Sequence, residues 1–479
     1  MTSLWIRVLL LQTLIFLVMV CVGRLFLGLR WRTACLAMAL ALPTPLFKVS
    51  PGAAGLVFSA DLVVVLFVFQ WAFGVLRARP DCTRSPARFM FLAISILFLL
   101  PGMSTFLGYL IFPEANRGLN YVAANTFRQI GYLVVFWAMT KKMQWEERPD
   151  RFVILQCLMF GAVAICGLVQ YAAKIDLDMW AEIRGLDQVG QTYGGGFMGL
   201  YRGAVGAYSV GVVAALTMLM PRVRSGMILG PVITIIIFGM MLAVGTRQGV
   251  AIGAFAFFLS LVFFVRSLPA GTRFAAFFRA TGFLLLVGIL ALVAVKVVFP
   301  AQFDAWIVKR FAGFESLSSI IALVKSRDVY GMSLAVQNLK DNPLMLFFGL
   351  GHGTEARTGT IFVKYGDHEL LNIWQIGGLP LLLSYIAFLL MLLVRFRRYR
   401  FLTDPVSRIY VATAFVVLAS SIPLLYGHFF ILNAYSGNAP VGYWHWSLFG
   451  GALGVLTKPE YMEGRQPEYV MYDASPAFT

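Results

Sequence analysis

The sequence predicts an all-α integral membrane protein with about 12–14 transmembrane helices and a large, partly helical outer loop before the last three spans. Three observations support this prediction. Hydrophobic residues make up 59% of the 479 residues and charged residues 13%, whereas a soluble domain carries about 25% charged residues. Apolar runs of about 17–25 residues, the length that crosses a ~30 Å hydrocarbon core, recur along almost the whole chain. The Lys and Arg residues cluster between these runs.

The first apolar run extends from about Leu4 to Leu29 and has no small-residue cleavage site. Because further runs follow it, we interpret it as a membrane anchor and not as a removed signal peptide. The second run, 33–47, contains Pro43 and Pro45 near its end, and it and the last run are short enough to be re-entrant. Predicted spans are centred near residues 16, 40, 65, 98, 130, 162, 212, 235, 257, 290, 386, 420 and 450.

The net charge of +17 is confined to short clusters between the apolar runs, a pattern typical of membrane topology and not of nucleic-acid binding. Under the positive-inside rule each cluster predicts a cytoplasmic loop. We therefore expect a transmembrane domain at 1–457 and a polar cytoplasmic tail at 458–479. The clusters are Arg77, Arg79, Arg84 and Arg88; Lys141, Lys142, Arg148 and Arg151; Arg222 and Arg224; Arg266, Arg273 and Arg279; Arg395, Arg397, Arg398 and Arg400.

Two connections, 173–203 and 300–377, are too long to be simple turns, and the charge alternation predicts both at the outer, periplasmic face. Long ordered loops in compact proteins are usually functional. Within the second loop, apolar residues spaced along 329–339 predict an amphipathic surface helix that Pro343 stops. We expect this helix to lie on the membrane surface as a lid.

Two arginines, Arg247 and Arg128, stand where positive charge is disfavoured, and a third, Arg202, is a further candidate. Arg247 lies in AVGTRQG, a tight outward connection between two spans, and Arg128 lies inside the fifth span. An ionisable residue in the membrane is a candidate functional residue, because its burial costs several kcal/mol (about 2.5–3.5 for Arg). The alternative to a functional role for Arg247 is that its side chain snorkels to the membrane surface as an anchor. The alternative for Arg128 is a structural ion pair within the helices. Arg202 follows a glycine-rich segment, which suits either anion contact or close helix packing.

Histidines provide the candidate proton-transfer group. His352 lies in GLGHGT, and His368 stands between Asp367 and Glu369 at the mouth of a span. If a helix begins near His368, this histidine shares one face of it with Leu371, Gln375 and Gly378. The alternative is that His368 has only a structural role.

The planar guanidinium of arginine suits the binding of phosphate, and histidine suits general-base catalysis. We therefore predict His368 as the catalytic base; Arg247, Arg327 and Arg202 as phosphate ligands; and Arg128, His352, Asp367 and Glu369 as supporting residues. The sequence shows no metal-ligand cluster and no P-loop, so no metal or cofactor is expected.

Three stretches, in this order, resemble the bacterial O-antigen ligase and O-antigen polymerase family. They are VGTRQG at 244–249, SRDVYGMSLAVQNLKDNPLMLFFGLGHGT at 326–354 and DHELLNIWQIGGLPLLL at 367–383. The resemblance covers roughly 195–395. Glu369 stands where the family often has asparagine, and Gln248 replaces a small residue; both departures concern how the acceptor is handled.

The resemblance implies a metal-independent, inverting glycosyl transfer from an undecaprenyl-pyrophosphate-linked glycan donor to a glycan acceptor, at the periplasmic face of the inner membrane. Expected partners are these two substrates, the lipid bilayer, and flippase and chain-length regulator proteins; nucleic acid is not expected. A polymerase of exopolysaccharide or O-antigen repeat units is favoured by the two enlarged outer loops. An O-antigen ligase acting on lipid A–core is the first alternative, and a polysaccharide or lipid transporter (flippase) is the second.

Overall fold

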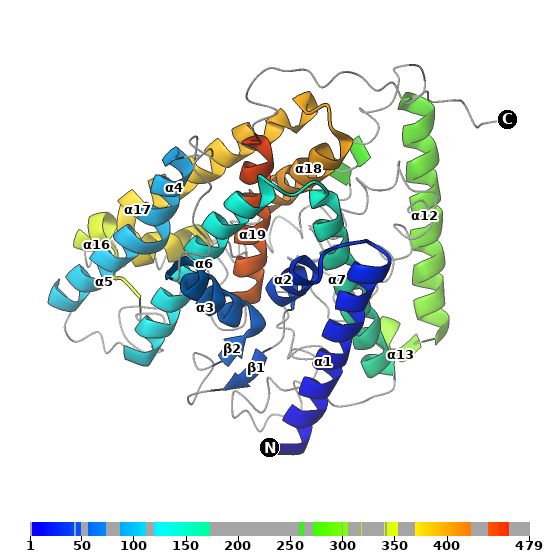
Figure 1. The fold of residues 1–479 in the computed structure, drawn as a ribbon, viewed down its shortest axis with the longest axis horizontal. Coiled ribbons are helices and arrows are strands. Elements are labelled where there is room, and N and C mark those ends of the chain that lie inside the picture. Colours follow the sequence, from blue (N-terminus) through cyan, green and yellow to red (C-terminus); the bar gives the residue numbers. More distant parts are fainter. Residues whose placement is uncertain are drawn as a thin grey trace.

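The computed structural model describes residues 2–42, 45–48, 56–72, 87–111, 119–172, 273–298, 300–304, 343–352, 369–422 and 439–458, with a few isolated positions between 258 and 340. Of the described residues, 89% are helical. Helices therefore dominate this part of the chain, and its single sheet is a hairpin of two short strands. Figure 1 shows the arrangement of the elements, whose labels are used below.

The first half of the chain contains these elements: α1 (Thr2–Leu25), α2 (Trp31–Ala41), β1 (Pro45–Lys48), β2 (Leu56–Phe58), α3 (Ser59–Ala72), α4 (Ala87–Ile94), a π-helical turn (Ser95–Leu99), α5 (Leu100–Ile111), α6 (Leu119–Met143) and α7 (Pro149–Ala172). The second half contains α12 (Arg273–Val298), α13 (Pro300–Phe303), α16 (Leu344–Phe348), α17 (Glu369–Phe396), a 3₁₀ turn (Arg397–Phe401), α18 (Pro405–Ser421) and α19 (Ala439–Leu456).

Helices α6 and α19 pack side by side and run in the same direction. The Tyr132 and Tyr443 rings meet edge to face with centroids 4.7 Å apart. Just beyond the C-terminal ends of the two helices, the Thr457 hydroxyl accepts a hydrogen bond of 2.9 Å from Gln144 Nε2. Glycines allow the close approach. A Cβ atom at Gly450 would overlap the carbonyl oxygen of Phe136, and one at Gly454 would overlap that of Thr140. Small residues at four-residue spacing commonly permit such packing between membrane helices.

An aromatic cluster joins α17 to this helix pair. The Trp446 ring lies 5.3 Å from the centroids of both the Phe136 and the Phe388 rings. Phe136 and Phe388 also meet each other, with centroids 6.1 Å apart. All three side chains are fully buried. Because they come from α6, α17 and α19, they fix these three helices against one another.

Two helices in the described chain are long and apolar enough to cross a membrane, Ala87–Ile111 and Leu370–Phe401. Shorter apolar helices are Leu9–Leu25, Ser59–Ala72 and Pro405–Ser420. Many apolar side chains point outward: Leu10 is 64% exposed, Leu66 58% and Phe106 65%. Several polar side chains point inward: Gln12, Gln156, Gln375 and Thr413 are at most 2% exposed. A soluble protein has the opposite preference, so this distribution is typical of helices whose outer faces meet lipid.

A π-helical turn interrupts the first of these two helices. Leu100 N–H donates to the carbonyl of Ser95, five residues earlier, instead of four. The next residue is Pro101, which has no N–H and whose ring would clash with the carbonyl four residues before it in a regular α-helix. The wider turn relieves that clash, so the helix passes the proline without ending.

Helices lie at the predicted span centres near residues 16, 65, 98, 130, 162, 290, 386, 420 and 450, and those at 98 and 386 are the two in the described chain that are long and apolar enough to cross a membrane. The predicted run 33–47 is wrong as a continuous segment, because α2 ends at Ala41 and β1 follows. Pro43 and Pro45 lack the N–H groups that would extend the helix. At 1.5 Å per residue α2 is about 16 Å long, about half of a bilayer core.

The hairpin that follows α2 was not predicted; β1 and β2 pair antiparallel with Phe47 opposite Val57. Helix α17 begins at Glu369, so residues 369–377 of the predicted outer loop are already helical. The expected spans near 212 and 235, most of the one near 257, the loop 173–203 and the surface helix 329–339 lie outside the described residues.

Candidate functional site

Five of the residues predicted for the site lie outside the described residues: Arg202, Arg247, Arg327, Asp367 and His368. Glu369 is described as the first residue of α17, without its side chain. The two others, Arg128 and His352, are both buried. Because His352 contacts Gln129, the residue after Arg128 on α6, both lie at one end of the helices. We call it the hairpin end, because it also contains β1–β2 and the first turn of α3 (Figure 1).

Arg128 lies on α6, and its side chain is 3% exposed. Its guanidinium carbon is 5.6 Å from the centroid of the Phe58 ring. It also interacts electrostatically with the carboxylate of Asp61, which is 6% exposed. A buried charge is tolerated when an opposite charge and hydrogen bonds accompany it. The residues around Arg128 therefore hold a guanidinium at a fixed position within the packed helices.

Asp61 is itself held by two hydrogen bonds. The Tyr443 hydroxyl donates to Oδ1 at 2.7 Å, and the Phe58 N–H donates to Oδ2 at 2.9 Å. The second bond caps α3, because a carboxylate three residues into a helix accepts from the N–H just before it. A negative charge in this first turn is also favourable to the helix dipole. Asp61 thus joins β2, α3, α6 and α19 at one point.

His352 is fastened to both α5 and α6. Its Nε2 lies 2.9 Å from Oε1 of Gln129, the residue after Arg128. An amide oxygen only accepts, so Nε2 carries the hydrogen in this contact. The His352 N–H donates to the Thr105 hydroxyl at 3.0 Å. His352 is 4% exposed, so the turn that carries it is anchored inside the protein.

The turn at 349–352 fits into a break in α17. Gly378 has φ of 64° and ψ of −166°, which is not helical, and Pro380 follows it. The break leaves backbone carbonyls of α17 without their usual partners. Two of them accept from the turn: Leu350 N–H donates to Gln375 O at 2.6 Å, and Gly351 N–H donates to Ile376 O at 2.9 Å.

Glycine is required on both sides of this contact. Gly349 and Gly378 both have positive φ, the left-handed region that other residues rarely adopt. A Cβ atom at Gly349 would lie 2.6 Å from the nitrogen of Gly378. A Cβ atom at Gly378 would in turn overlap the carbonyl oxygen of Phe347. The two backbones approach too closely for any larger residue, so the sequence GLG and the sequence GGLP form one structural unit.

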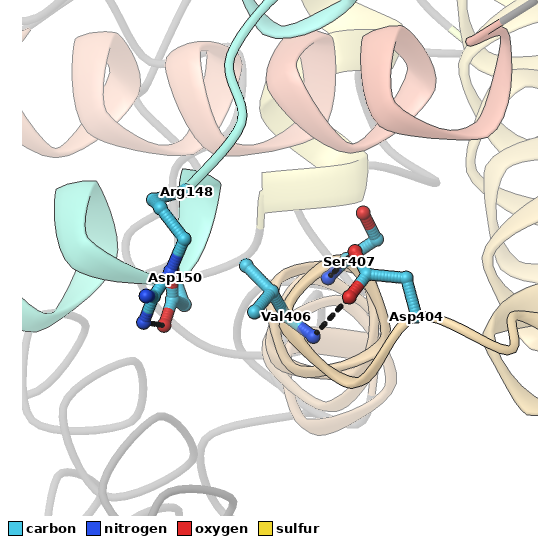
Figure 2. A network of polar contacts seen from close by, with 5 residues as sticks. All are labelled: Arg148, Asp150, Asp404, Val406 and Ser407. Atoms are coloured by element: carbon cyan, nitrogen blue, oxygen red, sulfur yellow. Dashed lines mark hydrogen bonds and ion pairs between the residues drawn. The ribbon is translucent and has the colours of Figure 1, made fainter. Parts of the chain in front are cut away.

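The opposite end of the helices gathers the basic residues, and we call it the basic end. Lys142 Nζ donates to the Thr33 hydroxyl at 3.1 Å, which joins the end of α6 to the start of α2. Lys458 Nζ donates to the carbonyl of Glu146 at 2.8 Å. Arg148 forms a two-pronged contact with Asp150, with N···O distances of 3.0 and 3.2 Å (Figure 2). Lys142 is fourteen residues beyond Arg128 on α6, about 21 Å along the helix axis, so the two ends are well separated.

Asp404 caps α18 at the basic end. Its carboxylate accepts from the N–H of Val406 at 3.0 Å and of Ser407 at 2.9 Å, as Figure 2 shows. Burial alone would raise the pKa of Asp404, but the hydrogen bonds from Ser407 and Val406 and the nearby charge of Lys458 outweigh it. The pKa of Asp404 therefore lies below its ordinary value.

Within the described part of the chain, no group of three His, Cys, Asp or Glu side chains is arranged to hold a metal ion. The chemistry available among these residues is that of a buried guanidinium, a carboxylate, a phenol, an imidazole and amides. Comparisons with protein-family models, curated proteins and solved structures find no match to this chain. Any functional assignment therefore depends on the residues themselves.

Sequence reasoning missed Asp61, Gln129 and Tyr443. Asp61 had a visible signal, since it is an acidic residue at the start of an apolar run, the pattern that led us to Arg128. Gln129 and Tyr443 had none, because an amide or a tyrosine in an apolar run is common. Their roles depend on which residues they meet from distant segments.

Proposed function

We propose that the chain is a multi-pass glycosyltransferase of the inner membrane that joins undecaprenyl-pyrophosphate-linked oligosaccharide units into exopolysaccharide or O-antigen. One structural observation carries this beyond the sequence resemblance. His352, in the glycine-x-glycine segment that resembles the family, is fastened to α6 next to the buried Arg128. This supports a site that combines the large loop with a guanidinium at one end of the helices.

The distribution of charge supports a periplasmic position for the site. The basic end gathers Lys142, Arg148 and Lys458, and basic loops remain on the cytoplasmic side. The hairpin end, with Arg128 and His352, would then face the periplasm, where lipid-linked oligosaccharides are joined. The apolar outward faces and the two helices of spanning length support the membrane setting. The proposed span count is 12–14 over the whole chain (about 17–25 residues each).

The proposed reaction is a single displacement. The oxygen of the acceptor hydroxyl attacks the anomeric carbon of the donor, and its proton passes to His368. The bond from that carbon to the pyrophosphate oxygen breaks, and undecaprenyl pyrophosphate leaves with the electron pair. Arg247 and Arg327, with Arg202, would stabilise the charge that develops on the leaving group, since fixed cations in a site shielded from water are effective there. Arg128 would add a further positive charge nearby.

Two alternatives to the polymerase predict different outcomes for the lipid-linked glycan. A ligase would transfer a finished glycan to lipid A–core. A transporter would move the lipid-linked glycan without making a bond, and the broken helix α17 favours this reading, because interrupted helices are common in transporter sites.

The deciding experiment uses the purified protein in liposomes with a lipid-linked oligosaccharide, followed by mass spectrometry of the products. Longer lipid-linked chains support the polymerase. Chains attached to added lipid A–core support the ligase. Movement of unaltered substrate across the bilayer, with no new glycosidic bond, would replace the proposal with a transporter.

A further inference from the structure

The first part of α17 carries two amide side chains with buried polar atoms that lack hydrogen-bond partners among the described residues. Gln375 is 1% exposed, and neither its Nε2 nor its Oε1 has a partner. The Oδ1 of Asn372 is also buried without one. The two residues are three positions apart, so they are neighbours on one side of the helix.

The fold itself does not use these amides. The carbonyl groups of Gln375 and Ile376 hold the turn at 349–352 through backbone hydrogen bonds. The indole of Trp374 donates to the carbonyl of Leu346 at 3.3 Å, which attaches α16. A leucine at position 375 would make the same backbone contacts. The amide groups therefore add nothing to the contacts that hold α17 in place.

A buried amide without partners destabilises a fold, and such groups in native proteins call for an explanation. The position of Gln375 suggests one. Its backbone contacts Leu350, two residues before His352, and His352 meets Gln129 beside Arg128. The unpaired amides thus belong to the same end of the helices as the proposed site.

We propose that Gln375, together with Asn372, binds the hydroxyl groups of the sugar portion of the substrate. A primary amide both donates and accepts, as a sugar hydroxyl does, and it is uncharged. It therefore suits the neutral glycan, whereas arginines suit the pyrophosphate. This inference rests on the proposed function in taking the ligand to be a glycan. It assigns the two amides to recognition of the sugar and not to the chemical step.

The test compares Gln375→Leu and Asn372→Leu with the unaltered protein in lipid nanodiscs free of sugar-based detergent. The probes are neutral oligosaccharides released from the surface polysaccharide of the cells that make this protein, and sugar-free undecaprenyl pyrophosphate. We expect each variant to bind the oligosaccharide about tenfold more weakly, the effect of losing one hydrogen bond or more. Binding of undecaprenyl pyrophosphate should not change. The unfolding temperature of Gln375→Leu without ligand should be equal or higher.

Gln12→Leu is the matched control. Gln12 is also a buried amide whose two polar atoms have no partner among the described residues, but it lies on α1, which packs against α2 and α7. Gln12→Leu should keep full oligosaccharide binding. Unchanged oligosaccharide binding in both α17 variants would overturn the inference, because it is the result expected if these amides bind only water. A lower unfolding temperature of Gln375→Leu would also overturn it. If the protein elongates chains but the Gln375→Leu and Asn372→Leu variants bind the oligosaccharide as tightly as the unaltered protein, the inference is rejected and the proposed function stands. Amide-dependent binding without any glycosyl transfer would support the inference and reject the proposed function.

Discussion

The Nε2 atom of His352 lies 2.9 Å from the Oε1 atom of Gln129, and this contact fastens the turn at 349–352 to the helix that carries Arg128. The same histidine donates its backbone N–H to Thr105 on α5. Both ends of the residue are therefore engaged in holding the turn in place. This geometry bears on the choice between the two histidines of the large loop, because an imidazole engaged in fixing a turn is less suited to accept a proton from substrate.

We predict that His352→Ala weakens the protein more than it slows the reaction. Loss of the contact leaves Gln129 buried without its partner, which costs about 1–3 kcal/mol of stability, and activity per folded molecule should fall less than about tenfold. His352→Gln should restore much of the stability by contacting Gln129 again. By contrast, His368→Ala should lower the rate by about 100- to 10,000-fold, as expected for loss of a general base. Rates of chain elongation and thermal unfolding in nanodiscs measure both effects. An inactive but stable His352→Ala protein, together with an active His368→Ala protein, would show that the base is His352.

The second prediction separates the two roles of Arg128. Asp61→Ala and Arg128→Ala should each destabilise the protein by about 3–5 kcal/mol, because each removes one member of a buried, oppositely charged pair of interacting side chains. The double variant should recover a large part of that stability, since neither charge remains. If Arg128 also binds pyrophosphate, activity should stay low in the double variant even where it folds. Recovery of full activity together with stability would make Arg128 a structural ion-pair residue and remove it from the site.

The third prediction concerns the packing of α6 against α19. Gly450→Val should destabilise the protein by about 1–3 kcal/mol or more, because its side chain would collide with the Phe136 carbonyl. Gly288→Val on α12 is the matched control, since a Cβ atom there meets nothing within 4 Å. Its unfolding temperature should stay close to that of the unaltered protein. Equal unfolding temperatures for the two variants would mean that α6 and α19 do not pack as closely as described.

The sequence allowed most helices to be located, since a run of apolar residues long enough for a bilayer is a local property. It also allowed Arg128 and His352 to be chosen as candidates, because a charged or histidine side chain stands out in an apolar context. The hairpin 45–58 could not be found in this way. Its strand residues are apolar, apart from Lys48, so β1 resembles the end of the apolar run before it and β2 the start of the apolar run that follows.

The partnerships within the site also lay beyond the sequence. Asp61 and Tyr443 are 382 positions apart, and Gln129 and His352 are 223 apart. Nothing local indicates that such residues meet. The break in α17 at GGLP was not predicted, and its role in holding the turn 349–352 depends on two backbones that approach each other through glycine. Sequence alone therefore identified candidates, and the packing of the helices shows which residues two of them, Arg128 and His352, contact.

The fourth prediction concerns pH. The pKa of Asp404 is lower in the folded protein than its ordinary value, so the cap contributes stability above the unfolded pKa of about 3.9. That contribution should be lost as the pH falls through the lower, folded pKa. At neutral pH Asp404→Ala should cost about 1 kcal/mol, the usual value of a helix cap. Asp404→Asn should retain most of the stability, since asparagine also caps helices. Its stability should no longer fall with pH through the titration of residue 404, because an amide does not titrate in this range. Unfolding temperatures between about pH 2 and 7 would measure this, and an identical acid profile for Asp404→Asn would exclude the carboxylate as its source.

The last prediction concerns the two arginines taken from the sequence. Arg247→Ala and Arg327→Ala should each lower the rate by about 100- to 1,000-fold, the effect of removing one group that stabilises developing negative charge. Each Arg→Lys variant should recover only part of the rate, because lysine cannot bind two phosphate oxygens with a planar fork. Arg408→Ala is the matched control: Arg408 donates to the carbonyl of Leu402 through Nε at 2.9 Å, at the basic end. Its loss should affect stability and leave the rate per folded molecule unchanged. Rates are measured with a lipid-linked oligosaccharide, and binding of undecaprenyl pyrophosphate is measured separately. If the alanine variants bind undecaprenyl pyrophosphate as tightly as the unaltered protein and extend chains at its rate, these arginines do not hold the leaving group.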